Sequence, residues 1–386
     1  MAMHHADVIV IGCGVTGSSI AYHLAKQGVR VHILERAEYA REPVASWASA
    51  GGVRRQGRHP AEAQLASEAI TRWQTLEEEL GSGADYRQGG NLLLAETEQA
   101  AAQLVTFVRE QQQRGFSDVR LVERHEALEL APGLNQRVLA GSYSPRDGQA
   151  DPRKTVHAFV AAAIRYGAIY RSHTPVQSLV MRQGRVVGVQ AGDEVVEAGH
   201  IVLAAGAWSD ELAASIGARL PVRTVALQMV CSIPAPALTL RPVLSAIGRA
   251  LSLKQLDDGA FLIGGGWQGK PDTDRRSYIL QPEYVQGNWD TARELLPVVG
   301  QQQIARAWCG LEARSIDDIP FIGSFSHIAG LTIACGFSGH GFALSPAVGR
   351  CVADHILGRP APELAGLQPD RIAQFQSEQI HAFMAG

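Results

Sequence analysis

The sequence lacks the features that mark several classes of protein. No apolar run approaches the roughly 20 residues that cross a bilayer, and the N-terminal segment MAMHHAD lacks the charged-then-apolar order of a secretory signal. The densest basic cluster, RRQGR at 54–58, is too short and isolated to indicate a nucleic-acid-binding surface. We therefore expect a cytoplasmic protein that does not bind nucleic acid, and peripheral attachment to the inner face of the membrane stays open.

Cysteines are few, and none of them form a C-x-x-C pair. The five are Cys13, Cys231, Cys309, Cys335 and Cys351. This scatter offers no metal-site spacing, so we expect reduced thiols and no metal. What the chain does contain is ordinary for a soluble enzyme: 46% hydrophobic residues, 19% charged residues and a formal net charge of -3. Its 386 residues exceed what one hydrophobic core usually supports, so two domains are expected.

The first 35 residues predict a strand, a glycine turn, a helix and a second strand. The apolar run at 8–11 suits a parallel strand that is buried on both faces. From 15 to 27, Ile20 and Leu24 lie one helical turn apart, and Gly28 supplies a stop signal. The segment VRVHILE then alternates and ends at Glu35. Together these elements form a βαβ unit of the usual length.

The turn in this unit has the pattern G-x-G-x-x-G. The first glycine permits a tight turn, the second lets a pyrophosphate approach the backbone, and the third lets helix and strand pack closely. An acidic residue at the end of the second strand can accept hydrogen bonds from ribose hydroxyls. A dinucleotide is therefore predicted here, and the motif alone leaves FAD and NAD open. The predicted contacts are Gly12, Gly14, Val15, Thr16, Gly17, Glu35 and Arg36.

The remainder of the chain predicts further elements of both kinds. Residues 61–80 and 151–167 have the composition and periodicity of helices, and HIVLAAGAW at 200–208 reads as a buried strand that enters a glycine turn. Residues 219–304 hold β-branched apolar runs separated by turns, which is typical of an antiparallel sheet. A helix is expected at 343–357, directly after the glycine-rich GFSGHGF.

Five segments in this order resemble one known family. They are DVIVIGCGVTG at 7–17, SWASAGG at 46–52, GQADP at 148–152, VLAAGAWS at 202–209 and GFSGHGF at 336–342. In these motifs the chain is similar to the FAD-dependent amino-acid oxidoreductases of the D-amino-acid oxidase, glycine oxidase and sarcosine oxidase group. The resemblance spans nearly the whole chain and favours FAD over NAD.

The resemblance implies an α/β fold with two interleaved domains. A Rossmann-like FAD-binding domain would comprise residues 1–81, 150–215 and 305–386. An α+β substrate domain, built on the antiparallel sheet, would comprise residues 82–149 and 216–304. Cofactor contacts are expected from the later motifs at Ser49, Ala50, Gly51, Gly52, Val176, Ala205, Gly206, Trp208, Gly310, Gly339, His340, Gly341 and Phe342. The helix start after GFSGHGF would stabilise negative charge at the flavin N1–C2=O edge on reduction.

Two departures from the family bear on the flavin. The monomeric sarcosine oxidases attach FAD covalently through a cysteine, and Gly310 rather than Cys309 aligns with that position, so we expect FAD to be held non-covalently. The same oxidases place a lysine over the flavin to assist the reaction with dioxygen, and Leu262 stands at that position. The missing cation favours a dehydrogenase that passes electrons to another acceptor.

A third departure concerns the substrate carboxylate. Glycine-oxidase-like sequences have an arginine where this chain has Glu312, and an arginine is suited to the task because its planar fork binds both carboxylate oxygens. The competing candidates are Arg54, Arg55, Arg58 and Arg314. His340 is a candidate for the space beside the isoalloxazine. The substrate pocket is expected to take aromatic walls from Trp267, Trp308, Phe337 and Phe342.

These features predict oxidation of the C–N bond of a small amino acid or N-substituted amino acid. Hydride would pass to flavin N5, and electrons would go on to a quinone, a dye-like carrier or dioxygen. Three alternatives stay open: an oxidase that produces hydrogen peroxide, an NAD-dependent dehydrogenase, and a flavin-bearing assembly or electron-relay subunit of a hetero-oligomer. A homo-oligomer or hetero-oligomer is compatible with the sequence.

Overall fold

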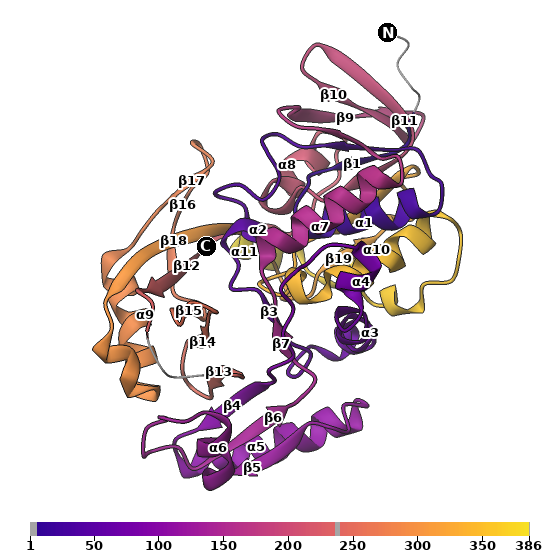
Figure 1. Cartoon of the computed structure of the whole chain (residues 1–386). Coiled ribbons are helices and arrows are strands. Elements are labelled where there is room, and N and C mark those ends of the chain that lie inside the picture. The colour runs from indigo at the N-terminus through magenta and orange to yellow at the C-terminus, as the bar shows by residue number, and fades with distance from the viewer. Residues whose placement is uncertain (1–5, 236–239, 386) are drawn as a thin grey trace.

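The computed structural model describes residues 6–235 and 240–385 and contains two large sheets (Figure 1). The first sheet has eight strands, of which six follow the order β19-β20-β11-β1-β2-β8. Its strands are β1 (Ala6–Ile11), β2 (Val31–Leu34), β8 (Ile169–Arg171), β9 (Val176–Arg182), β10 (Arg185–Ala191), β11 (Glu194–Leu203), β19 (Phe321–Gly323) and β20 (Leu331–Cys335). Strands β20, β11, β1, β2 and β8 are parallel to one another, as the βαβ unit predicts.

Strand β1 shows why the apolar run at its centre is continuous. Val8 and Val10 join the core on one face of the sheet, whereas Ile9 and Ile11 join the core on the other face. All four are at most 4% exposed. Because successive side chains of a strand point to opposite faces, a strand that is covered on both sides needs an apolar residue at every position.

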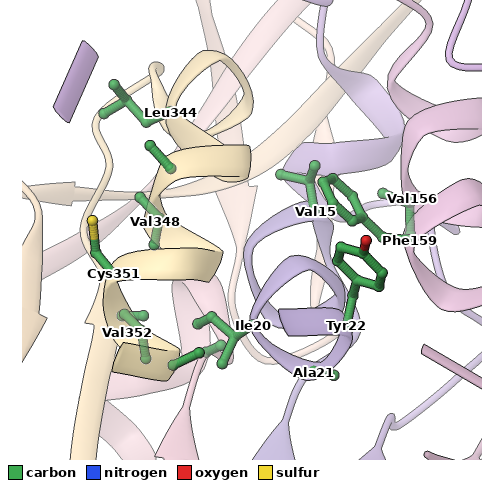
Figure 2. Packing of buried hydrophobic residues seen from close by; sticks show 14 of the residues in the cluster. Val15, Ile20, Ala21, Tyr22, Val156, Phe159, Leu344, Val348, Cys351 and Val352 are labelled. Carbon is green, nitrogen blue, oxygen red and sulfur yellow. The ribbon is translucent and has the colours of Figure 1, made fainter. Parts of the chain in front are cut away.

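Three helices stack beside one another on one face of this sheet. Helix α1 (Val15–Lys26) packs between α10 (Gly341–Ile356) and α7 (Pro152–Arg165), and Ile20 and Tyr22 point to opposite neighbours (Figure 2). Helix α3 (Ala63–Trp73) packs against α10 in turn. The predicted helices at 15–27, 151–167 and 343–357 are thus confirmed within two residues at each end.

The second sheet has ten strands, and it is largely antiparallel. Nine of them follow the order β17-β16-β12-β15-β14-β13-β4-β6-β5, and β18 pairs with β12. The strands are β4 (Asn91–Ala95), β5 (Arg120–Glu123), β6 (Ala140–Ser144), β12 (Val222–Ser232), β13 (Val243–Ala246), β14 (Ser252–Gln255), β15 (Phe261–Gly264), β16 (Gln268–Asp272), β17 (Ser277–Ile279) and β18 (Ile304–Ser315). Only the pairing of β13 with β4 is parallel among the described pairs of this sheet.

Short elements connect the two sheets. Strands β3 (Gly52–Val53) and β7 (Gly148–Gln149) form a small ribbon between them (Figure 1). The other helices are α2 (Ala45–Ala48), α4 (Leu76–Leu80), α5 (Glu98–Gln113), α6 (Arg124–Leu130), α8 (Ser209–Ala214), α9 (Pro282–Leu295) and α11 (Ser377–Ala385). Across the described ranges, each helix is too short or too polar to cross a bilayer.

The interleaving expected from the resemblance is visible in the sheet membership. Strands β4–β6 and β12–β17 belong to the second sheet, and the chain returns to the first sheet between them. Strand β18 also pairs with β12 along its length, so the second sheet extends beyond residue 304, where a domain boundary was predicted. The α/β fold class with an antiparallel second sheet is confirmed.

Candidate functional site

A cleft of about 170 Å³ opens where the parallel strands of the first sheet end. Its walls include Ile11, Leu34 and Ala204, each at or just after the carboxyl end of a strand. Ligands of open α/β sheets bind at this edge. We call this space the cofactor cleft.

The three glycines of the turn have different surroundings. Gly12 has a φ of +96°, and a Cβ there would lie 2.5 Å from the carbonyl oxygen of Ala204. A Cβ on Gly17 would lie 2.1 Å from the carbonyl oxygen of Gly12, so strand and helix could not pack as they do. A Cβ on Gly14 would meet only the hydroxyl of Ser46, at 3.1 Å. Its open side faces the cleft, as expected where a pyrophosphate approaches the backbone.

Glu35 and Arg36 are two of the charged residues that line the cleft. The carboxylate of Glu35 is fixed by the backbone N–H groups of Cys13 and Ala37, at 2.8 and 3.1 Å. The guanidinium of Arg36 lies 4.3 Å from the ring centre of Trp208. Its Nη1 atom is buried and has no hydrogen-bond partner within the described part of the chain. A buried donor without a partner is costly, so this atom indicates a ligand that accepts a hydrogen bond.

Two helices begin at this cleft, and neither is capped by the side chain of the residue that precedes it. Gly14, which precedes α1, has no side chain, and the side chain of His340, which precedes α10, does not bond to the first turn of that helix. The hydroxyl of Ser46 accepts a hydrogen bond from the N–H of Val15 over 2.9 Å, so one N–H group of α1 is already paired. The first residues of both helices line the cleft. Because the N-terminus of a helix presents unpaired N–H groups and partial positive charge, the cleft suits a ligand with two electron-rich parts. FAD would fit this description, with its pyrophosphate expected at α1 and its flavin expected at α10.

Most of the residues expected to contact FAD line the cofactor cleft. These are Gly12, Gly14, Val15, Thr16, Glu35, Arg36, Ser49, Val176, Ala205, Gly206, Trp208, Gly339, Gly341 and Phe342. Another four, Ala50, Gly52, Gly310 and His340, line the neighbouring cavity described next. Gly17 and Gly51 line neither space and permit close backbone packing, since a Cβ on Gly51 would lie 2.0 Å from the carbonyl oxygen of Ala150. Their direct contact with FAD stays a prediction.

A larger cavity of about 670 Å³ adjoins the cleft, and we call it the central cavity. It lies between the segment from α2 to η1 (Pro60–Glu62), the second sheet and the loop before α10. Five residues line both spaces: Ala45, Ser49, Glu312, Gly339 and Phe342. The two spaces therefore share a wall, which is the arrangement that a cofactor cleft and a substrate pocket require.

Two arginines of the basic cluster face the central cavity. Arg58 is 6% exposed, and its Nε donates to the carbonyl oxygen of Arg54 over 3.1 Å. Within residues 6–235 and 240–385, neither guanidinium has a carboxylate at ion-pair distance. Burial lowers the pKa of both side chains, that of Arg58 to about 9. Glu62 and Asp147 are near enough to act on both charges, but neither forms an ion pair with them. Two arginines that are withdrawn from solvent and lack an ion-pair partner form a ready site for an anion.

The other substrate-side candidates are placed differently. Arg55 is 2% exposed, pairs with Asp118 and lies 4.9 Å from the ring centre of Phe116, away from the central cavity. Arg314 lines the cavity, but both of its bonds to Asp318, at 2.7 and 2.9 Å, occupy its fork.

The aromatic candidates are also distributed unevenly. Trp267 lines none of the described cavities, because its Nε1 donates to the carbonyl oxygen of Ala250 and its ring packs against Tyr284. Phe337 lines the cofactor cleft, and Phe342 lines both the cleft and the central cavity. Trp308 lines a third space, described below.

His340 lies on the wall of the central cavity and forms a pair with Glu62. Its Nδ1 is 3.0 Å from Oε1 of Glu62, which is 1% exposed. Burial lowers the pKa of His340, so the neutral ring donates its Nδ1–H to the carboxylate. Although burial alone would raise the pKa of Glu62, the bond from His340 lowers it. Sequence reasoning identified His340 but missed Glu62, which lies 278 residues away.

Glu312 is the second residue that sequence reasoning left without a role. It lines both the cleft and the central cavity. Its Oε1 accepts a hydrogen bond of 2.6 Å from the backbone N–H of Gly339. Burial nevertheless raises the pKa of Glu312 to about 7. No sequence signal distinguishes such a carboxyl group from an exposed one.

A third space of about 280 Å³, the lysine cavity, shares Ser49 and Ala50 with the central cavity. Lys254 and Leu262 line it, and Lys254 is 5% exposed with no carboxylate at ion-pair distance in the described residues. Burial lowers the pKa of Lys254 to about 8. Cys309 lines none of the three spaces and packs with Ala226 and Leu311 instead.

One group of possible metal ligands occurs elsewhere. The ligand atoms of Glu68, Cys351 and Glu363 lie within 4.8 Å of one another. Arg350 donates to a carboxylate oxygen of Glu68 over 2.5 Å and of Glu363 over 2.7 Å. The guanidinium thus already supplies the positive charge at this cluster.

The fold and the cleft define a dinucleotide-dependent oxidoreductase with a second cavity beside its cofactor cleft. The chain belongs to the DAO family of FAD dependent oxidoreductases, whose profile matches residues 7–355, and FAD is its cofactor. It is therefore a FAD-dependent oxidoreductase, and the prediction of FAD rather than NAD is confirmed.

Three known proteins illustrate the similarity. Glycine oxidase of Bacillus licheniformis is 29% identical over 97% of this chain and 98% of its own length. Mitochondrial dimethylglycine dehydrogenase of Mus musculus is 28% identical over 97% of this chain, which spans only 45% of that protein. The crystal structure of L-proline dehydrogenase from P. horikoshii superimposes with a TM-score of 0.89 at 27% identity, covering 96% of this chain and 98% of that one.

Proposed function

We propose that this protein oxidises the C–N bond of a small amino acid or N-substituted amino acid to an imine and acts as a dehydrogenase. The imine then hydrolyses to a carbonyl compound and an amine. When bound, FAD would supply the two-electron chemistry, with flavin N5 as the acceptor of hydride from the carbon atom. The observation that carries this proposal is the pair of arginines, half-buried Arg54 and buried Arg58, that face the central cavity without a carboxylate at ion-pair distance in the described residues.

The side chains of the cavity have separate tasks in this reaction. Arg54 and Arg58 bind the substrate carboxylate, and their fork geometry orients the molecule against the shared wall of the cleft. Phe342, on that shared wall, excludes water from the reacting atoms. The uncapped N-terminus of α10 stabilises the negative charge that develops on reduction.

The relatives support the substrate class. Dimethylglycine, glycine and L-proline, named in the relatives above, share an α-carboxylate and a nitrogen on the same carbon. They differ in the substituents on that nitrogen, from none to two methyl groups or a ring. A common carboxylate site with a variable nitrogen pocket is therefore the part of the function that this chain is expected to share.

The dehydrogenase proposal rests on Leu262, which the resemblance aligns with the oxygen-assisting lysine of the monomeric sarcosine oxidases. One observation favours a second candidate, an oxidase that produces hydrogen peroxide. Lys254 is the direct cross-strand partner of Leu262 and lines the same cavity, so a cation is present one strand away. A positive charge beside the flavin would stabilise the anion formed by the first electron transfer to dioxygen.

A product assay tests the proposed function. The purified holoenzyme is incubated with glycine, sarcosine, dimethylglycine, L-proline and D-amino acids, with a dye as electron acceptor, and the carbonyl product is trapped with an arylhydrazine. We expect a hydrazone from at least one of these compounds, and dye reduction in equal amount. Hydrazone formation from none of them, while the flavin stays reducible by dithionite, would contradict the proposal.

A further inference from the structure

The wall shared by the cofactor cleft and the central cavity contains one ionisable side chain. The other four shared residues, Ala45, Ser49, Gly339 and Phe342, carry no titratable group. The reacting edge of a bound flavin must lie where its cleft opens into the substrate cavity, because the substrate carbon has to reach it. Glu312 therefore lies on the wall where the C–H bond beside the substrate nitrogen would be broken.

The carboxyl group of Glu312 has spare capacity for a ligand. Its Oε1 accepts from the N–H of Gly339, whereas its Oε2 has no hydrogen-bond partner within the described residues. The nearest arginine along the strand, Arg314, is already paired with Asp318. No cationic side chain of the described ranges lies at ion-pair distance from Glu312.

The charges around the central cavity have a consistent arrangement. Its other charged and titratable groups are Arg54, Arg58, His59, Glu62, His340, Arg314, Asp317 and Asp318. Glu62 is bonded to His340, and Arg314 is bonded to Asp318, so these pairs are internally satisfied. Asp317 is paired with Arg371. The cavity groups that have no ion pair among the described residues are therefore the basic Arg54 and Arg58 and the acidic Glu312, although Glu62 and Asp147 act on the two arginines from a greater distance.

An α-amino acid has the complementary pattern, with a carboxylate and an ammonium group on one carbon. On the basis of the proposed function, we infer that Glu312 binds the cationic nitrogen of the substrate and takes its proton before hydride leaves the carbon. In this step an N–H bond of the ammonium breaks and an O–H bond forms on Oε2. The amine becomes neutral, because the electrons of the broken N–H bond stay on nitrogen as its lone pair. The carboxylate becomes a carboxylic acid, and neither group is oxidised or reduced.

The environment of Glu312 suits both halves of this role. Burial raises its pKa to about 7, in spite of the bond from Gly339, which favours the charged form. A carboxyl group with an ordinary pKa would hold the ammonium in its protonated form and oppose the loss of hydride. A carboxyl group that titrates near neutrality accepts the proton at much lower cost.

Ligand binding tests this inference without catalysis. Glycine betaine and tert-butylacetate have the same shape and the same carboxylate, but only betaine carries a positive charge, and neither has a proton on that atom to lose. Binding of each to the FAD-loaded protein is measured above pH 7 by the change in flavin absorbance, for the parent and for Glu312→Gln. We expect the parent to prefer betaine by roughly tenfold and the variant to lose that preference.

The outcomes separate this inference from the proposal on which it rests. Glu110→Gln removes an exposed carboxylate on α5 and is the matched control, which should keep the preference for betaine. The same preference in Glu312→Gln and in the parent would overturn the role of Glu312 alone. Binding of neither ligand by the parent would overturn the carboxylate site of the proposed function, and this inference with it.

Discussion

Lys254 and Leu262 are directly paired on the antiparallel strands β14 and β15, and both line the lysine cavity. Directly opposed residues of an antiparallel pair have Cβ atoms about 5 Å apart on one face of the sheet. Lys254 is buried and has no carboxylate at ion-pair distance among the described residues. We therefore expect the reactivity of the reduced enzyme with dioxygen to depend on how close this ammonium lies to the flavin.

The first prediction concerns the electron acceptor. After anaerobic reduction by a good substrate, we expect slow reoxidation in air and faster reoxidation by a dye or quinone. Replacing Leu262 by lysine should raise the oxygen rate, and the change is best made together with Lys254→Met because two adjacent ammonium groups repel each other. Stopped-flow reoxidation against oxygen concentration measures the effect. A parent that reacts with dioxygen as fast as with the best dye would contradict the dehydrogenase proposal.

Lys254 itself predicts a pH dependence. Since burial lowers its pKa to about 8, the side chain is charged below that pH and loses its charge as the pH rises through it. Any oxygen reaction that Lys254 assists should therefore slow above about pH 8. In Lys254→Met the rate should not show this decrease at high pH. An identical pH profile in the parent and the variant would show that the ammonium does not assist the reaction.

The proposed carboxylate site predicts that replacing Arg54 raises the KM for an amino-acid substrate more than replacing Arg314, which lines the same cavity. Arg54→Met should raise the KM for an amino-acid substrate about 100-fold, which corresponds to the roughly 2–3 kcal/mol of a charged hydrogen bond. Arg314→Met is the matched control, because its guanidinium is already bound by Asp318. Steady-state kinetics with a dye acceptor measures both. Equal effects of the two substitutions would remove Arg54 from the carboxylate site.

Glu312 predicts an acidic limb in the rate of flavin reduction. Below a pKa of about 7 the group is protonated and cannot take the proton of the substrate ammonium. The limiting rate of reduction should then fall by about tenfold for each pH unit. Glu312→Gln should be slower and should lose this limb. Persistence of the limb in the variant would assign it to another group of the cavity.

The glycine turn predicts the flavin content. Gly14→Leu should abolish FAD binding, because its side chain would occupy the open face of the turn in the cofactor cleft. Gly300→Ala is the control, since a Cβ there meets only Arg293 at 3.5 Å. The absorbance of the purified proteins measures FAD. Acid treatment of the parent should release intact FAD, and flavin retained on the precipitate would contradict non-covalent binding.

The elements that could be predicted are those with a strong local signal. The glycine turn and the helices α1, α7 and α10 follow from periodicity and from stop residues within a few positions. The predicted helix at 61–80 is two helices, α3 and α4, because Thr75 leaves helical geometry with φ -118° and ψ 4°. Leu76 is buried like Trp73, so the apolar face continues across the break and hides it. Helix α9 was missed inside a stretch dominated by strand signals.

The site could be predicted only where its residues lie in one motif. The basic cluster at 54–58 identified the correct segment, but nothing local shows that Arg55 turns toward Asp118 while Arg54 and Arg58 face the cavity. The pairs that complete the site join distant parts of the chain, as Glu62 and His340 do. Such pairs depend on how the two sheets pack together, and no motif or regular spacing in the sequence predicts them.

The central claim is that a carboxylate-bearing amine gives up hydride from the carbon beside its nitrogen. The most direct measurement is anaerobic reduction of the bound FAD by matched pairs, namely sarcosine with dimethylamine and proline with pyrrolidine. The account predicts that at least one amino acid bleaches the visible absorbance band of the flavin after anaerobic mixing. Its carboxylate-free counterpart should leave that band unchanged. Bleaching by neither member of any pair, or equal bleaching by both, would contradict it.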